Sequence, residues 1–307
     1  MRVREIIRYA VEKSGLCAPD AIGDQLWAFA LAALNRVYED VWYLRPWNNE
    51  KLVNVEVTSS TGELILPWYV DAIMGVREGL TALDPVDALK VHAIDPAAFT
   101  RTGTACEYYR LPDSPVLTQP SSSGVITFTS TSADDDGDSF PVRVCGDDDG
   151  TEYRETVDLD GTADADTENS YDNLSRLTKP ETTGRITVKS GSTELGIIQP
   201  WETTPRYKRV QVLDLPDAST TYYVQATRKF EPLVSDYDSL VLKTCESAII
   251  DLLIAELLEQ GGDDERAMVM RQRANTRIAE AHDMEVEREA QDQSIYPAAP
   301  LFDGLGE

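Results

Sequence analysis

Three acidic runs, each ending at or close to a glycine, carry the residue types that a metal ion would need. They occupy residues 134–138, 147–150 and 158–161. Calcium takes six to eight oxygen ligands, and an EF-hand loop needs acidic residues at positions 1, 3 and 5, glycine at 6 and glutamate at 12. With each glycine at position 6, positions 1 and 12 hold Ser132 and Arg143, Cys145 and Thr156, or Thr156 and Thr167. Because aspartate and glycine favour turns, we interpret the runs as turns between strands, with a calcium site as the alternative.

Paired carboxylates are a second source of chemistry, because 54 Asp and Glu residues guarantee close pairs somewhere in the chain. Such a pair can hydrolyse a glycosidic bond, but a hydrolase of this kind also needs a cleft lined by aromatic side chains. The five tryptophans are scattered along the sequence, which contains no GxSxG, GxxxxGK[ST] or GxGxxG pattern. We therefore predict that the protein is not an enzyme.

Cysteine and histidine are too few and too dispersed for a zinc or redox centre. The four cysteines are Cys17, Cys106, Cys145 and Cys245, and no two lie within a few residues of each other. That spacing supports neither a zinc knuckle nor a CxxC pair, and only two histidines are present. We expect reduced thiols and no cofactor.

Basic residues cluster in one region of this acidic chain. Arg206, Lys208 and Arg209 lie on one expected strand, and Arg228 and Lys229 lie on the strand expected beside it. Such a patch could bind the acidic surface of an adjacent copy. The alternative is an exposed strand face whose charges pair within the chain.

Helical patterns occupy both ends of the chain. A stripe over residues 3–11 and a longer one over residues 26–44 predict two helices with buried faces. Near the other end, residues 245–257 predict a further helix, and Gly261 and Gly262 end it. The helix after this turn has a thin, heptad-like apolar stripe on a surface rich in Arg and Glu, formed by Ala267, Met270, Ala274, Ile278 and Ala281.

Strand patterns occupy the middle of the chain. Alternating apolar residues predict β-hairpins over residues 52–66 and between residues 207–213 and 221–230. Between these two regions the chain is rich in Ser, Thr, Gly and Asp. It carries short alternating runs near residues 124–131, 140–145, 151–159, 173–178, 184–190 and 194–199. Short strands at this spacing are typical of an antiparallel sandwich of immunoglobulin type.

The predicted fold class is therefore α+β: a discontinuous helical-bundle domain with β-hairpins, plus an inserted all-β immunoglobulin-like sandwich. We expect residues 1–116 and 205–291 to form the first domain and residues 117–204 the insertion. Residues 292–307 have no periodicity, which predicts an extended tail.

The charge balance excludes several classes of function. The 307 residues contain 28 Lys and Arg against 54 Asp and Glu, a net charge of −26. Such a chain repels phosphate, so we expect no sequence-specific nucleic-acid binding. No apolar stretch approaches the roughly 20 residues of a membrane span, and no signal-peptide pattern opens the chain. We expect a protein made in the cytoplasm and not associated with a membrane.

Three segments of the chain resemble the head-to-tail adaptor (connector) proteins of tailed bacteriophages. They are DQLWAFALAALNRVYEDVWYLRPW at 24–47, YYVQATRKFEPLVSDYDS at 222–239, and CESAIIDLLIAELLEQGGDDERAMVMRQRANTRIAEAHDMEVEREAQ at 245–291. Residues 117–213 look like the immunoglobulin-like modules of phage virion proteins, in phrases such as QPSSSGVITFTSTSADD and PRYKRVQVLDLPD. The likeness lies in composition and order and not in a signature residue.

The resemblance implies a structural protein of the virion neck. Such adaptors form a ring, commonly of twelve copies, which sits under the portal, joins head to tail and extends the DNA channel. The implied partners are the portal protein, tail nozzle or tail-tube proteins and further copies of the chain. The insertion could decorate the neck, contact tail fibres or stabilise neighbouring copies.

The candidate partner-binding residues follow from the apolar stripe, the tail and the basic cluster. They are Ala267, Met270, Ala274, Ile278, Ala281, Ile295, Tyr296, Arg206, Lys208 and Arg209. A thin apolar stripe on a charged helix suits docking into a partner's groove. The alternative function is a phage tail or neck protein that binds host-surface glycans through the immunoglobulin-like module.

Overall fold

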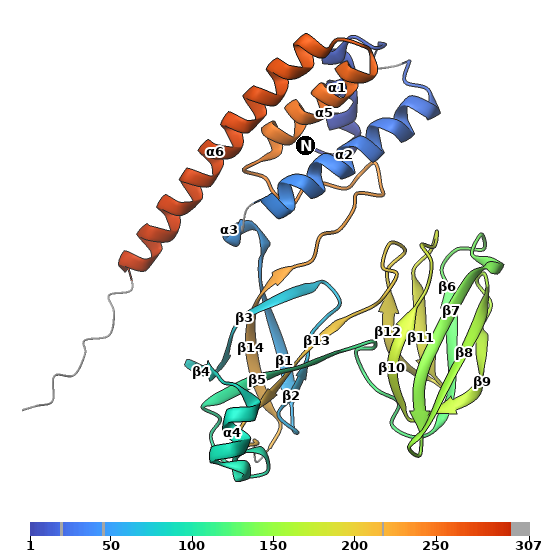
Figure 1. Cartoon of the computed structure of the whole chain (residues 1–307), viewed down its shortest axis with the longest axis vertical. Helices are drawn as coiled ribbons and strands as arrows, with labels where there is room; N and C mark the ends of the chain where they lie inside the picture. Colours follow the sequence, from blue (N-terminus) through green and yellow to red (C-terminus); the bar gives the residue numbers. More distant parts are fainter. Residues whose placement is uncertain (19–20, 45–46, 217, 296–307) are drawn as a thin grey trace, which may run out of the picture. The chain divides into compact units, whose positions relative to one another are not determined.

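The computed structural model describes residues 1–18, 21–44, 47–216 and 218–295, and it divides the chain into two compact units. Residues 1–52 and 230–307 form one, here called the helical unit. Residues 53–229 form the other, here called the β unit. The chain is thus mixed α and β, as predicted, with most of its regular structure in sheets (Figure 1). The predicted three-part division at residues 117, 205 and 292 stays a prediction.

The helical unit contains α1 (Val3–Ser14), α2 (Asp24–Leu44), α3 (Asn48–Lys51), α5 (Glu246–Gln260) and α6 (Asp264–Ile295). The stripe predicted over residues 3–11 is confirmed, since its five apolar members are all buried in the first helix. Gly15 ends that helix in the left-handed conformation, at φ 77°. Among the described residues, no helix combines the length and apolar composition that crossing a bilayer requires.

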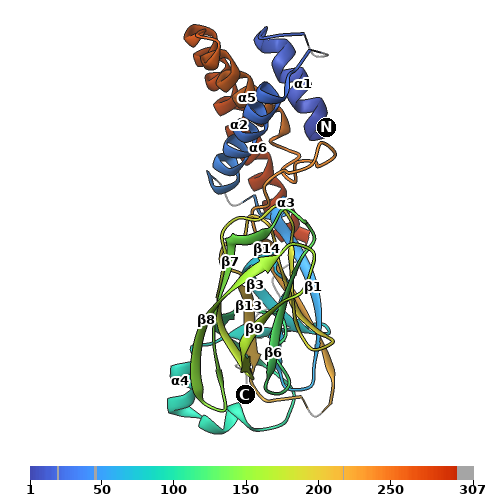
Figure 2. The same cartoon turned by 90° about the vertical axis from the view of Figure 1, so that its right-hand side faces the viewer.

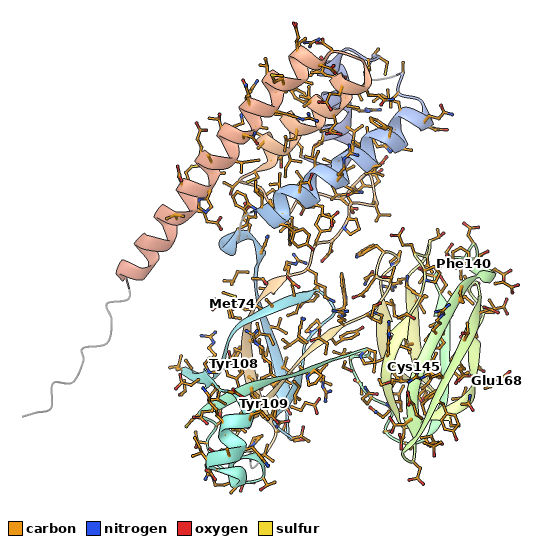
Figure 3. All side chains as sticks on the ribbon, viewed as in Figure 1. Met74, Tyr108, Tyr109, Phe140, Cys145 and Glu168 are labelled. Atoms are coloured by element: carbon orange, nitrogen blue, oxygen red, sulfur yellow. The ribbon has the colours of Figure 1, made fainter. Side chains whose placement is uncertain are left out.

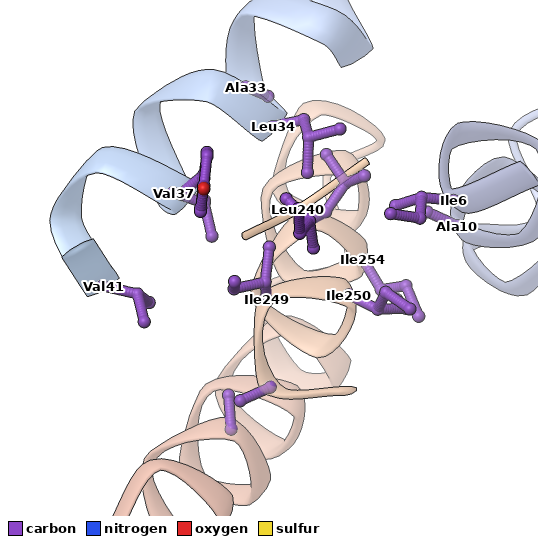
Figure 4. Close-up of a cluster of buried hydrophobic side chains, with 14 of the residues drawn as sticks. Ile6, Ala10, Ala33, Leu34, Val37, Val41, Leu240, Ile249, Ile250 and Ile254 are labelled. Atoms are coloured by element: carbon purple, nitrogen blue, oxygen red, sulfur yellow. The ribbon is translucent and has the colours of Figure 1, made fainter. Parts of the chain in front are cut away.

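The α5 helix is the centre of this unit, because α1, α2 and α6 all pack against it (Figures 1 and 2). Figure 4 shows Ile6 and Ala10 of α1 and Leu34 of α2 approaching the same core as Ile249 and Ile254. A helix with partners on several sides must be apolar around most of its circumference. Accordingly, nine of its fifteen residues are buried, including the charged residue Asp251.

The β unit contains a seven-stranded sheet in the order β1-β14-β3-β4-β5-β13-β2. Its strands are β1 (Leu52–Ser59), β2 (Glu63–Ile65), β3 (Val70–Glu78), β4 (Thr81–Pro85), β5 (Glu107–Ser114), β13 (Tyr207–Val212) and β14 (Thr220–Arg228). The short helices α4 (Ala88–Ile94) and η1 (Pro96–Phe99) connect β4 to β5. The buried face of the sheet includes Tyr108, which Figure 3 labels, together with Val210 and Val224.

Both predicted hairpins are wrong. β1 and β2 stand at opposite ends of the strand order, and β13 pairs with β5 and β2 while β14 pairs with β3. The segments predicted as turns, 59–62 and 215–219, do separate consecutive strands along the chain, but a connection alone does not fix the partner of a strand. The neighbour of each strand is decided by which pairing buries its apolar face in the common core. The hairpin between β3 and β4, around Gly79, was not predicted.

The remaining strands form two further antiparallel sheets. Their orders are β10-β7-β8 and β12-β11-β6-β9, and both sheets contribute to one core that contains Phe128, Val144 and Ile186. The strands are β6 (Gly124–Ser130), β7 (Asp136–Asp148), β8 (Thr151–Asp160), β9 (Ala165–Tyr171), β10 (Asn173–Thr178), β11 (Ile186–Ser190) and β12 (Thr193–Ile198). Six of the seven coincide with predicted strands. β9 was missed because its buried positions are Ala165, Thr167 and Tyr171, a weakly apolar set.

Candidate partner-binding groove

A groove of about 690 Å³ lies among α1, α5 and α6 of the helical unit. Its apolar lining comes from Tyr9, Ile250, Ile254 and Met270. The two isoleucines belong to the buried core, at 8% and 1% exposed, so Tyr9 and the half-buried Met270 supply the apolar surface that solvent reaches. An apolar surface between helices that is open to solvent suits an inserted side chain of another segment.

Two arginines of α6 form one wall of the groove, and a buried carboxylate holds both. Asp251 lies 3.2 Å from Arg273 Nε and 2.7 Å from Arg277 Nη1. Arg277 also donates to the backbone carbonyl of Ser247 at 3.1 Å. Burial raises the pKa of Asp251, and the two guanidinium groups act in the opposite direction. The arginine side chains remain 53% and 30% exposed, so their charges still face the groove.

Two lysines line the groove as well. Lys13 Nζ lies 5.3 Å from the centroid of the Tyr9 ring, and Lys243 Nζ lies 3.8 Å from a carboxylate oxygen of Glu246. The groove therefore presents four basic side chains against two carboxylates, Glu246 and Asp251. In a chain of net charge −26 this is a locally positive surface. Its chemistry suits an acidic peptide that also carries bulky apolar side chains.

The predicted α6 stripe has mainly an intramolecular role. Ala267, Ala274, Ile278 and Ala281 are buried in the core of the helical unit, where α6 packs on α5. We expected these residues to dock on a partner, but the apolar surface of α5 already covers them. Met270 alone of the five is half-buried and lines the groove.

The two residues predicted from the tail lie at the limit of the described chain. Ile295 is the last residue of α6, and Tyr296 lies outside the described residues. The docking roles expected for these two residues therefore stay predictions.

The predicted basic cluster is mostly neutralised within the β unit. Lys208 pairs with Asp113 at 2.9 Å, Arg209 pairs with Glu63 at 2.6 Å, and Lys229 pairs with Glu202 at 3.0 Å. The Arg228 guanidinium lies 5.7 Å from the centroid of the Tyr69 ring, and Arg206 is exposed. Because β13 and β14 are not neighbours, the five residues do not form one face of a strand pair. A partner-binding role for Arg206, Lys208 and Arg209 stays a prediction.

The second half of α6 extends beyond the core of its unit. α6 has 32 residues and α5 has 15, which correspond to about 48 Å and about 22 Å of helix. The last residue of α6 in the core is Ala281, and His282 lies 6.4 Å from the Trp47 ring. Beyond it, Met284 and Val286 are each 49% exposed. Sequence periodicity predicted the α6 helix but could not show where α5, the helix it packs against, ends.

The acidic runs have structural roles that the sequence indicates only in part. The turn predicted at residues 147–150 is confirmed, since β7 ends at Asp148 and Gly150 adopts φ 77° before β8. Residues 136–138 lie inside β7 instead of in a turn. Within the described ranges, no group of three or more His, Cys, Asp and Glu side chains is arranged to hold a metal ion.

Sequence reasoning missed the role of Asp135. This residue is fully buried and accepts hydrogen bonds from the Ser130 hydroxyl at 2.6 Å, Thr183 N–H at 2.7 Å and Gly184 N–H at 2.8 Å. Its carboxylate therefore links the 183–184 segment to the end of β6 through hydrogen bonds.

Comparisons with known proteins leave the assignment to the chain's own features. No known protein family matches the sequence, and no curated protein matches it.

Proposed function

We propose that this protein is a head-to-tail adaptor of a tailed bacteriophage. Copies of it would form a ring under the portal, extend the DNA channel and join the head to the tail components in the virion neck. Three quoted segments that resemble such adaptors support the proposal. They correspond to α2 and the residues that follow it up to 47, to β14 with the loop after it, and to α5 with α6. Within this proposal the two-sheet sandwich corresponds to an inserted immunoglobulin-like module, and the role is structural, not enzymatic.

The observation that carries the proposal is the second half of α6. A helical segment that extends beyond its core becomes more stable when another surface packs against it, because isolated helical segments are marginal in water. The described part of this segment presents Met284 and Val286 to solvent. These side chains suit a groove-docking helix, and the portal is the partner that the resemblance implies.

The charge of the chain also supports a role around a DNA channel. Twelve copies at −26 each carry roughly −312, a large repulsive field for DNA phosphates. Repulsion lets DNA pass without binding to the wall, whereas a basic wall would retain it.

Light scattering tests the proposal directly. The mass of the full chain is measured alone and after co-expression with the portal protein of the same genome. We expect a portal-bound ring, with or without self-association of the free chain. A stable small oligomer that never binds the portal would contradict the adaptor role. It would favour the alternative, a protein that binds host-surface glycans.

A further inference from the structure

We propose that the groove of the helical unit binds residues 296–307 of a second copy of this chain. The inference deepens the ring of the proposed function by naming a contact between neighbouring copies, and it rests on that function for the ring itself. The contact is argued from the groove and from the sequence that follows α6.

Residues 296–307 have the chemistry that the groove requires. They contain Leu301, Phe302 and Leu305 as bulky apolar side chains, Asp303 and Glu307 as acids, and no Lys or Arg. The groove offers an apolar lining between basic side chains. Apolar burial together with opposite charge is the combination by which a short segment binds a groove specifically.

Distance argues against the groove of the same chain. Among the α6 residues that line the groove, Arg277 is the nearest in sequence to Ile295 and precedes it by 18 residues, about 27 Å along a helix that Figure 1 shows as straight. Phe302 follows Ile295 by seven residues, so an extended chain carries it at most about 25 Å. Met270 lies a further seven residues from Arg277, about 10 Å deeper along α6. Phe302 therefore falls short of the Met270 side of its own groove, and we assign the contact to a second copy.

This contact joins two different surfaces of the same protein. A head-to-tail contact of this kind generates a ring if the rotation closes, and an open filament if it does not. Met284 and Val286, the exposed residues assigned to the portal, precede this segment, so the two docking roles use different parts of the chain.

A binding titration tests the chemistry of the contact. A fluorescent peptide with the sequence of residues 293–307 is titrated into the full chain, and anisotropy reports binding. We expect saturable binding that weakens about tenfold when Lys13→Glu and Lys243→Glu are combined. Binding should weaken at least as much when the peptide carries Leu301→Ala and Phe302→Ala. Neither lysine holds the buried carboxylate, so the fold is retained.

Lys90→Glu is the matched control, because Lys90 is an exposed helical lysine in the β unit. This substitution makes the same charge change and should leave the affinity unchanged. The inference is overturned if binding is not saturable up to roughly 1 mM, or if the groove and control variants bind equally well.

Disulfide trapping tests whether the contact joins two copies. Two full-length variants are mixed under oxidising conditions, one carrying Lys13→Cys and the other Asp303→Cys, both with the exposed Cys106 changed to Ser. We expect a covalent dimer that contains one chain of each kind. A chain carrying both new cysteines that closes only on itself would overturn the contact between copies.

The two proposals fail separately. If the chain forms a portal-bound ring but the groove substitutions change neither its assembly nor the disulfide trapping, this inference is wrong and the adaptor role stands. Peptide binding and trapping without any portal complex would leave the groove contact and remove the adaptor.

Discussion

Asp135 is the residue whose environment departs furthest from its sequence context. It belongs to a run of four acids in five positions, yet it alone in the run is buried. Its neighbours Asp134 and Asp136 are exposed. Two of its three donors, Thr183 and Gly184, are almost 50 residues away, so the local sequence does not show the site. Burial of a charge at this site is stable because three donors compensate for lost hydration.

Removing this carboxylate should destabilise the sandwich. Asp135→Ala leaves a hydroxyl and two backbone N–H groups without their acceptor, and we expect the free energy of unfolding to fall by about 3 kcal/mol. Urea unfolding followed by circular dichroism measures the loss. Asp134→Ala is the matched control and should change the value by less than about 0.5 kcal/mol, because its side chain is exposed. Equal effects of the two substitutions would contradict the role of Asp135.

The same residue should make stability depend on acid pH. Burial acts to raise the pKa of Asp135, but the hydrogen bonds from Ser130, Thr183 and Gly184 outweigh it and hold the pKa below its usual value of 3.8. The stabilisation is therefore complete above the unfolded-state pKa and is lost as the pH falls through the lower folded-state pKa.

Asp135→Asn removes this titration. Compared with the unmodified protein, it should lose less stability between pH 5 and about pH 2, measured by urea unfolding at each pH. Parallel pH profiles for the two proteins would show that other carboxylates account for the acid sensitivity.

At the scale of elements, α6 performs two tasks along its length. Its first half packs on α5 through Ala267 and Ala274, and its second half leaves the core after Ala281. Small residues at the contact let the two helices approach closely, and Asp251 pairs with arginines across the same interface.

Substitutions in the two halves should separate stability from binding. Ala274→Asp buries an unpaired charge and should cost at least about 3 kcal/mol of unfolding free energy. Met284→Glu combined with Val286→Glu should leave that free energy within about 0.5 kcal/mol, because both side chains are exposed. The same double variant should recover less portal in a pull-down from co-expressing cells. Unchanged recovery would show that this half of α6 does not carry the portal contact.

Sequence patterns predicted helices better than strand partners. A helix with one buried face shows its periodicity locally, so α1 and α2 were located to within a few residues. The partner of a strand depends on distant segments instead. β14 pairs with β3, about 150 residues earlier in the chain. The segment before β14 connects it to β13, and these two strands are not neighbours in the sheet.

The candidate site was predictable only in part for a related reason. The stripe on α6 predicted an apolar contact, and Met270 does line the groove. Periodicity cannot distinguish a surface that packs on α5 from one that packs on another protein. Tyr9 and Lys13 enter the groove from α1, more than 230 residues before α5, and nothing in their local sequence indicated this juxtaposition.

At the scale of the whole molecule, the helical unit is built from both ends of the described chain. Residues 1–52 supply α1 and α2, and residues 230 onward supply α5 and α6. The β unit is one continuous stretch between them. Since α5 is the element on which α1 and α2 pack, the core of the helical unit requires both chain segments.

This arrangement has a consequence during translation. About 200 residues separate the end of α2 from the start of α5, so the ribosome needs roughly 10–40 s to supply the missing surface. Until then Ala33, Leu34 and Val37 lack the α5 part of their core, while the β unit can fold once its last strand has left the ribosome.

In ribosome-bound chains in which residue 245 is followed by a linker that fills the exit tunnel, we expect a protease to cut within α2 but to spare residues 53–229. Protection of α2 in such chains would contradict the requirement for α5. Synthesis that stops just short of α5 should therefore leave an aggregation-prone nascent chain, although four-fifths of the sequence has been made.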